Sequence, residues 1–215
     1  MEHYFIEKEH KNDDFFEFTW QFEGVDYIFK SCDDVFSKDN VDYGTYVLLK
    51  TILKKIDISG DVLDIGCGYG PIGIVLSKSF SNVKVTMTDV NGTAVALSQE
   101  NAKRNNAKNV IEIKLSNAYE NINKTFDFIV SNPPIKAGKK VLLNILLGSY
   151  NRLNDGGNLI FVIKKKFGED GVKKELQKTF KSVEVIKRDS GYYILSAKKW
   201  GGNENNNKSC SWDKG

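Results

Sequence analysis

Residues 61–73 read Asp61-Val-Leu-Asp-Ile-Gly-Cys-Gly-Tyr-Gly-Pro-Ile-Gly73, in which a short apolar run leads into a glycine-rich loop and then into a helical segment. The glycines of this loop permit tight turning and let the backbone approach a ligand closely. The amides at the start of the following helix supply hydrogen-bond donors, and Pro71 suits the first turn of that helix. The stretch therefore predicts a nucleotide-type binding loop between a strand and a helix of an α/β fold.

Short apolar runs and helical segments alternate on both sides of this loop. The apolar runs lie at residues 61–65, 83–88, 110–115, 126–130 and 159–163, and the helical segments at 41–56, 72–80, 93–105, 139–152 and 172–180. Such alternation predicts a mostly parallel sheet with crossover helices, the Rossmann-like class of α/β fold. Residues 183–187 and 192–197 flank the turn signal Asp189-Ser190-Gly191, so the last strand is expected to be antiparallel.

An N-terminal β-hairpin is expected to precede this core. Residues 16–22 and 25–29 alternate between apolar and polar side chains, with Glu23-Gly24 between them. Asp39 or Asn40 is available as the N-cap of the first helix. We expect one domain over residues 1–200, made of a hairpin extension at 1–35 and an α/β core at 36–200. Residues 201–215 lack periodicity and are expected to be a disordered tail.

The composition suits a single globular core. The chain has 215 residues, of which 40% are hydrophobic, and no apolar run approaches the roughly 20 residues needed to cross a bilayer. The N-terminus is charged and lacks the apolar stretch of a signal peptide, so we expect a cytoplasmic protein away from membranes, with a monomer as the default. Cys32, Cys67 and Cys210 have neither disulfide nor zinc-ligand spacing, and no metal site is expected.

Charge is distributed unevenly along the chain. Residues 1–60 carry 7 Lys/Arg and 13 Asp/Glu, whereas residues 136–199 carry 15 Lys/Arg and 6 Asp/Glu. A basic C-terminal half suits a polyanionic partner such as RNA, although ordinary solvated helix faces explain many of these lysines equally well.

Two carboxylates and one amide indicate which ligand the glycine loop binds. Asp64 would repel a pyrophosphate but suits the ammonium group of a methionine moiety, and Asp89 ends the next strand, where it can accept both hydroxyls of a ribose. These features favour S-adenosylmethionine over a dinucleotide. Asn117 follows the third strand of the core and can accept a hydrogen bond from an adenine amino group, but a polar turn explains it nearly as well.

Asn132, Pro133 and Pro134 follow the fourth apolar run, at the sheet edge where open α/β folds bind ligands. The carboxamide oxygen of Asn132 and the carbonyl of Pro133 can each accept one N–H of a planar amine, which aims the nitrogen lone pair at a methyl donor. The two prolines restrict the backbone and hold the acceptors in place. This tripeptide predicts methyl transfer to an exocyclic amino nitrogen.

The combination of Asp64-Ile-Gly-Cys-Gly-Tyr-Gly-Pro-Ile-Gly73, Thr88-Asp89 and Ser131-Asn-Pro-Pro134 resembles the methyltransferase small-domain family, which includes ribosomal small-subunit RNA guanine-N2 methyltransferases. The resemblance extends from about Tyr4 to Lys199. It implies that the cofactor S-adenosylmethionine is bound by Asp64, Gly66, Gly68, Gly70, Asp89, Asn117 and Asn132. It also implies that Asn132 and Pro133 hold the target amine and that Phe36, Asp42 and Gly44 border the substrate pocket. We add Pro134 to the catalytic tripeptide, and Ile135 and Lys136, which follow it, to the expected pocket.

The chain departs from this family in two respects. Ile135 stands where members acting on adenine or guanine often have a stacking aromatic residue, so stacking on the base is expected to be weaker or to come from elsewhere, with Tyr69, Phe36 and Tyr43 as candidates. The guanine-N2 enzymes that it resembles carry a second, N-terminal domain, whereas this chain has room for one. RNA contacts are therefore expected on the surface of this domain, and the candidate residues are Lys136, Lys139, Lys140 and Lys164–Lys166.

The expected activity is methylation of guanine N2 in ribosomal RNA. Adenine N6 and a protein glutamine amide remain alternatives, because each presents a planar amine to the same tripeptide. The basic C-terminal half favours nucleic acid over protein. Two further alternatives are a non-catalytic RNA-binding protein with a vestigial cofactor pocket and a nicotinamide-dependent oxidoreductase, which Asp64 disfavours.

Overall fold

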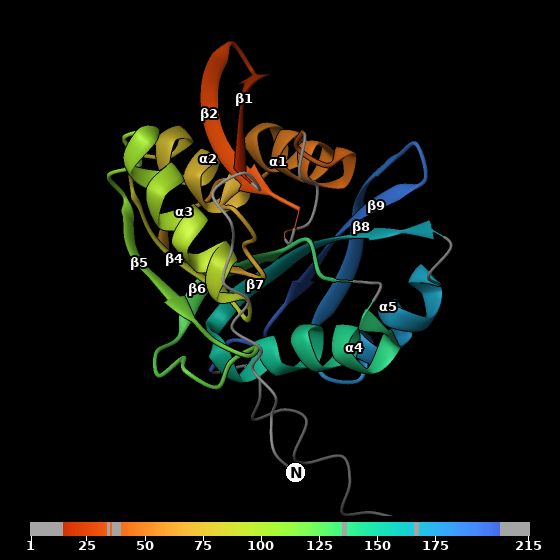
Figure 1. The fold of residues 1–215 in the computed structure, drawn as a ribbon. Helices are drawn as coiled ribbons and strands as arrows, with labels where there is room; N and C mark the ends of the chain where they lie inside the picture. Colours follow the sequence, from red (N-terminus) through yellow and green to blue (C-terminus); the bar gives the residue numbers. More distant parts are fainter. Residues whose placement is uncertain (1–14, 34, 36–39, 135–136, 166–167, 203–215) are drawn as a thin grey trace, which may run out of the picture.

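The computed structural model describes residues 15–33, 35, 40–134, 137–165 and 168–202 (Figure 1). Within them a seven-stranded sheet has the order β5-β4-β3-β6-β7-β9-β8. The strands are β3 (Gly60–Ile65), β4 (Val83–Asp89), β5 (Val110–Leu115), β6 (Phe126–Ser131), β7 (Leu153–Lys164), β8 (Ser182–Asp189) and β9 (Tyr192–Lys198). The first five pair in parallel, and β9 pairs antiparallel with both β7 and β8. The predicted Rossmann-like sheet with an antiparallel last strand is confirmed.

Helices cover both faces of the sheet (Figure 1). One face carries α1 (Tyr43–Lys55), α2 (Pro71–Ser79) and α3 (Gly92–Arg104), and the other carries α4 (Lys139–Gly148) and α5 (Glu169–Gln177). Two hydrophobic clusters, one on each side of the sheet, contain the buried apolar residues of these helices. Burial of apolar side chains on both faces is what a central, mostly parallel sheet requires.

Several predicted helix ends are wrong by a few residues. The N-cap of α1 is Asp42, whose side chain accepts a hydrogen bond from Thr45 N, and not Asp39 or Asn40. The predicted helix at 139–152 ends at Gly148 and continues as a 3-10 turn, Ser149–Arg152. The helix predicted at 172–180 runs from Glu169 to Gln177, because Gly168, at φ 77°, begins the turn earlier than the apolar spacing indicates.

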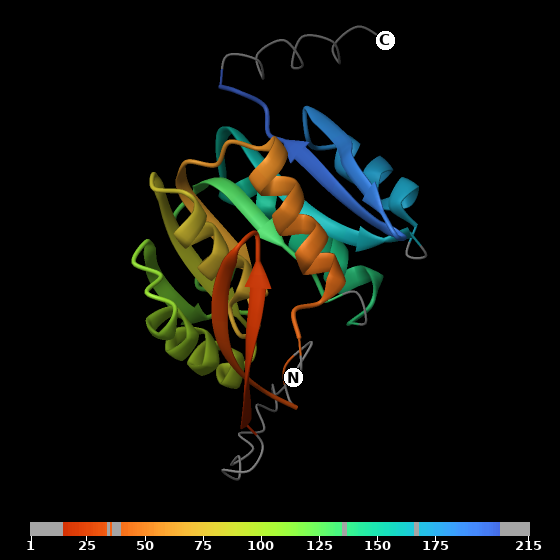
Figure 2. The same ribbon diagram turned by 90° about the horizontal axis from the view of Figure 1, so that it is seen from above.

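The predicted N-terminal hairpin is present as β1 (Phe15–Phe22) and β2 (Val25–Cys32), with Phe22 paired to Val25 across the turn. It packs against α3 (Figure 2). Two asparagines one turn apart, Asn101 in α3 and Asn105 at its C-cap, bind the backbone of β2. Asn101 accepts a hydrogen bond from Lys30 N and donates to Lys30 O, and Asn105 does the same with Ile28. Each amide thus satisfies backbone groups that a further strand would otherwise pair.

Asn101 also connects this hairpin to the glycine loop. Its side chain, which is fully buried, donates a second hydrogen bond to Tyr69 O at 2.8 Å. The hairpin is therefore held to the segment that the sequence predicts to bind a ligand.

Candidate active site

The predicted site residues gather at the carboxyl-terminal edge of the parallel strands. The glycine loop follows β3, and Asn132 follows β6, the strand beside it. Because β4 lies on the other side of β3, the chain order reverses between β3 and β6. Open α/β sheets bind ligands in the crevice at such a switch point.

The glycine loop is built on positive φ angles. Gly66, Gly68 and Gly70 have φ of 74°, 58° and 99°, a region that favours glycine. A Cβ at Gly70 would lie 2.9 Å from Met87 Cε, whereas a Cβ at Gly66 or Gly68 would meet no atom within 4 Å among the described residues. The loop thus packs tightly against β4 at its end and exposes its first two glycines to open space where a ligand has room.

Asp64 is a buried carboxylate with one unused oxygen. Its Oδ2 accepts a hydrogen bond from Gly73 N at 2.9 Å, and its Oδ1 is buried without a hydrogen-bond partner in the described part of the chain. Burial raises the pKa of Asp64 to about 7, the Gly73 N–H lowers it in part, and the negative charge of Asp89 adds to the increase. An unpartnered buried carboxylate oxygen beside open glycines fits a cationic ligand group such as the ammonium of S-adenosylmethionine.

Asp89 fastens the glycine loop to β4. Its Oδ2 accepts from Gly68 N and its Oδ1 from Asn91 N, both at 2.9 Å. The N-cap of α3 is Asn91, so Asp89 does not serve as that cap. Each carboxylate oxygen has a further lone pair, which leaves the pair of oxygens able to accept hydroxyls as well.

Asn117 and Val90 lie at the same edge of the sheet as Asp89. Asn117 is exposed and donates from Nδ2 to Glu120 Oε1 at 2.9 Å, which leaves its carbonyl oxygen as the acceptor. Val90 is 52% exposed directly after Asp89, and the sequence reading missed it. The sequence does contain a signal for Val90, because it is an apolar residue that directly follows Asp89, the residue predicted to bind the ribose.

Asn132 is held in one orientation by two acceptors from the start of α1. Its Nδ2 donates to Asp42 Oδ2 at 2.7 Å and to Thr45 Oγ1 at 2.9 Å. A carboxylate only accepts hydrogen bonds, so the amide nitrogen must face Asp42 and the carbonyl oxygen must face away. Asp42 therefore caps α1 and orients Asn132 at the same time. Sequence reasoning missed Thr45, because nothing local links it to a residue 87 positions away.

The remaining pocket residues divide between those the structure describes and those it does not. Pro133 is buried and Pro134 is exposed directly after Asn132. Gly44 is buried under Tyr192, whose Cε1 would lie 2.8 Å from a Cβ at position 44. The other three predicted pocket residues, Phe36, Ile135 and Lys136, lie outside the described residues.

Of the three aromatic residues expected to stack on a base, Tyr69 is unsuitable. It is 2% exposed and packs in the core against Phe18 and Phe29. Tyr43 is 43% exposed at the start of α1, where its hydroxyl donates to Asp189 Oδ1 at 3.0 Å.

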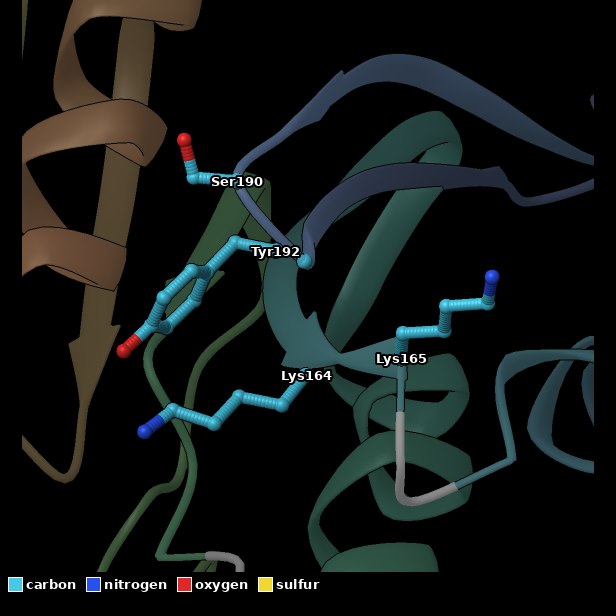
Figure 3. A pocket seen from close by; sticks show the side chains of 5 residues that line it. Lys164, Lys165, Ser190 and Tyr192 are labelled. Atoms are coloured by element: carbon cyan, nitrogen blue, oxygen red, sulfur yellow. The ribbon is translucent and has the colours of Figure 1, made fainter.

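The predicted lysines do not share one environment. Lys139 and Lys140 are exposed at the start of α4, and Lys166 lies outside the described residues. Lys164 is half-buried, with its Nζ 5.0 Å from the centre of the Tyr192 ring. An open depression of about 610 Å³ lies here, lined by Lys164, Lys165, Ser190, Gly191 and Tyr192 (Figure 3).

Comparison with known proteins agrees with this geometry. The family model of the methyltransferase small domain matches residues 26–196. The Bacillus subtilis protein YbxB is 40% identical over 200 residues, covering 92% of this chain and 98% of that protein. Ribosomal RNA small subunit methyltransferase C of Photorhabdus laumondii is 35% identical over 185 residues, which are 84% of this chain and 52% of that enzyme. The chain thus spans about half the length of the latter relative.

Among solved structures, the Thermus thermophilus 16S rRNA N2 G1207 methyltransferase, in complex with AdoMet and guanosine, superposes with a TM-score of 0.74. It is 24% identical, and the match covers 86% of this chain and 51% of that one. This likeness supports the fold. In the described part of this chain, none of the helices combines the length and apolar character of a bilayer-spanning segment.

The family match covers most of the chain, and the glycine loop with its unpaired buried carboxylate oxygen fits the cofactor expected from the sequence. The chain belongs to the methyltransferase small-domain family, and its cofactor is S-adenosylmethionine.

Proposed function

We propose that this protein transfers the methyl group of S-adenosylmethionine to guanine N2 in ribosomal RNA. The observation that carries the proposal is the orientation of Asn132. Because Asp42 and Thr45 both accept from Nδ2, the Asn132 carbonyl oxygen is presented beside the glycine loop as a fixed acceptor. A fixed acceptor costs no reorganisation when charge develops on the substrate.

The residues of the chain have distinct roles in this proposal. Asp64 holds the ammonium group of the cofactor, Asp89 its ribose hydroxyls and Asn117 its adenine amino group, with Val90 against the adenine ring. When bound, the cofactor supplies an electrophilic methyl group.

Asn132 Oδ1 and the Pro133 carbonyl each accept one N–H of the target amine. A base amino group is a poor nucleophile because its lone pair is delocalised into the ring, and two acceptors favour the pyramidal geometry that frees it. The methylated nitrogen is cationic and acidic, so its proton can leave to water without a strong general base.

Two observations support RNA as the substrate. The relative from Photorhabdus laumondii is named for ribosomal RNA, and the C-terminal half of this chain is basic. Exposed Lys139 and Lys140 flank the active-site edge, where phosphate contacts position a substrate without reading its sequence.

The test is incubation of the protein with methyl-labelled S-adenosylmethionine and RNA from cells that lack its gene, followed by digestion to nucleosides. We expect label in N2-methylguanosine, formed about 10²–10³-fold more slowly with Asn132→Ala. Label in N6-methyladenosine would mean that the target base is adenine and not guanine. An absence of label in any RNA, with cofactor binding intact, would overturn the RNA substrate and direct the search to protein glutamine.

A further inference from the structure

The start of α1 connects Asn132 to the depression beside Tyr192. Asp42 Oδ2 lies 2.7 Å from Asn132 Nδ2 and would lie 2.9 Å from a Cβ on Gly44. The Tyr192 ring would lie 2.8 Å from the same Cβ position, so Tyr192 and Asp42 are neighbours. Asn132, Asp42 and Tyr192 therefore follow one another along one wall of the site.

Lys164 continues this wall. Its ammonium lies over the Tyr192 ring at 5.0 Å from the centroid, and Figure 3 shows the Lys164 ammonium and the Tyr192 hydroxyl extending to the same side. Interaction with Tyr192 and, to a smaller extent, the negative charge of Asp42 raise the pKa of Lys164, which keeps it a cation. Lys165 lines the same depression but points away (Figure 3).

The three polar groups differ in what they offer a ligand. Asn132 presents a carbonyl oxygen, which accepts, and Lys164 presents an ammonium, which donates. The Oδ2 of Asp42 is used by Asn132 and by Thr45 N, whereas no donor among the described residues pairs with its Oδ1. The wall thus presents an acceptor, a second acceptor and then a donor.

Guanine carries the complementary sequence on its Watson–Crick edge, namely the N2 amino group, the N1–H and the O6 carbonyl. We propose that Asp42 and Lys164 make this site specific for guanine, with Asp42 Oδ1 accepting the N1–H and Lys164 Nζ donating to O6 while Asn132 holds the N2 amine. Tyr192 acts as the positioning residue for Lys164. This inference rests on the proposed function and specifies the base that it uses.

The same wall selects against other planar amines. A purine with an unprotonated N1 would place a lone pair against the Asp42 carboxylate, and like charges or facing acceptors are unfavourable. A base without O6 leaves the Lys164 ammonium without its acceptor. Selectivity then comes from the edge of the base and does not need an aromatic residue at position 135.

The test compares guanosine with 2,6-diaminopurine riboside, which keeps the 2-amino group but has an unprotonated N1 and an amino group in place of O6. Each nucleoside is titrated, by ligand-observed NMR, into protein saturated with S-adenosylhomocysteine. The variants are Asp42→Asn and Lys164→Met, with Lys165→Met as the matched control. Asparagine is as good an N-cap as aspartate, so α1 is retained.

We expect the wild-type protein and Lys165→Met to prefer guanosine by about tenfold or more, the usual contribution of a specific base-edge contact. Asp42→Asn should invert this preference, because the introduced amide keeps its oxygen toward Asn132 and so turns its NH₂ toward N1. Lys164→Met should weaken guanosine binding about tenfold and leave the other nucleoside nearly unchanged.

The inference is overturned if Asp42→Asn weakens both nucleosides equally, if Lys164→Met behaves as Lys165→Met, or if the wild-type protein binds neither nucleoside. Failure of the proposed function has a different signature, which is the absence of N2-methylguanosine when the wild-type protein is incubated with labelled cofactor and RNA. If the wild-type protein methylates guanine N2 but Asp42→Asn keeps the wild-type preference for guanosine, the proposed role of Asp42 and Lys164 is wrong and the proposed function stands.

Discussion

The cofactor half and the substrate half of the active site are assembled in different ways. In the cofactor half, Asp64 binds Gly73 nine positions later, and Asp89 binds Gly68 within the adjacent strand-loop unit. In the substrate half, Asn132 binds Asp42, which is 90 positions away, and Tyr43 binds Asp189 across 146 positions.

Because of this difference, the two halves affect the stability of the ligand-free protein in different ways. The cofactor half leaves a buried carboxylate oxygen without a partner in the described part of the chain, which destabilises the ligand-free protein in return for affinity. In the substrate half, by contrast, both hydrogen bonds donated by Asn132 Nδ2 also join the segment after β6 to the first turn of α1. Substitutions in the two halves should therefore have opposite signatures.

The largest effect is expected for Asn132→Ala, which removes the fixed acceptor. Methyl transfer should fall by about 10²–10³-fold, as for loss of a preorganised donor or acceptor in other sites. The affinity for S-adenosylmethionine should change by no more than about tenfold, the contribution of one neutral hydrogen bond. Initial rates and calorimetric titration on the same preparations measure both.

Asn121→Ala is the matched control for that variant. Asn121 is an exposed asparagine at the same sheet edge that donates to Leu115 O, away from Asn132. Its substitution should leave methyl transfer within about twofold, in line with surface changes. Equal losses in both variants would mean that the Asn132 acceptor has no special role.

The next largest effect is expected for Asp64→Asn. The variant keeps an oxygen for Gly73 N but loses the charge that pairs with the cofactor ammonium, so the Kd should rise by about 10–100-fold. In the wild-type protein the same carboxyl has a pKa of about 7, so cofactor affinity should fall as the pH drops below 7 and the group is protonated. Calorimetry from about pH 5.5 to about pH 8.5 should show this slope in the wild-type protein and none from this group in the variant.

The ligand-free stability of Asp64→Asn should move in the opposite direction. The folded pKa of about 7 exceeds the usual value of 3.8, so the folded wild-type protein binds the extra proton and loses stability as the pH rises between these values. Above pH 7 the variant should be more stable by about 2–4 kcal/mol, and near pH 4 the two should be similar. Urea denaturation at about pH 4.5 and about pH 8 would contradict the account if the difference did not grow with pH.

A smaller effect, on stability alone, is expected for Asn101→Ala. The substitution leaves Lys30 N, Lys30 O and Tyr69 O without their partner, and should lower the free energy of unfolding by about 2–3 kcal/mol. Lys103→Ala on the exposed side of α3 is the control and should change it by less than about 0.5 kcal/mol. Equal stability of the two variants would mean that the hairpin is not held through this amide.

The smallest effect is expected for Tyr69→Phe. Tyr69 is buried, and its hydroxyl makes one long hydrogen bond, to Asn40 O at 3.4 Å. Activity on RNA should stay within about twofold, since the ring remains in the core. A large loss of activity would restore Tyr69 as a residue that contacts the base.

The proposed cofactor half could be picked out from the sequence because its signals are local, and the roles of its residues stay predictions. Three loop glycines, Asp64 near the end of β3 and Asp89 at the end of β4 are each recognised from neighbouring residues in the sequence. The alternation of apolar runs with helical segments likewise predicts five strands of the sheet, and the turn signal Asp189-Ser190-Gly191 predicts the other two. Helix ends are predicted less well. The N-cap of α1 is Asp42 and not Asn40, and the Asp42 carboxylate also accepts a hydrogen bond from Asn132, a contact that the local sequence does not reveal.

The substrate half could be predicted only in part. Asn132 stands out by its motif, but Thr45 and Tyr192 have no motif and become site residues only when α1 and the β8–β9 turn meet across the sheet edge. Lys164 stands out only as one member of a lysine run, and its place over Tyr192 distinguishes it from Lys165. The roles of Phe36, Ile135 and Lys136 stay predictions.

The fixed orientation of Asn132 can be observed directly in a crystal structure of the protein with S-adenosylhomocysteine and guanosine. We predict that Asn132 Nδ2 remains on Asp42 and Thr45, with Oδ1 about 3 Å from the exocyclic N2 of the base. A base bound elsewhere, or an Asn132 amide that releases Asp42 and turns its nitrogen toward the ligand, would contradict the account.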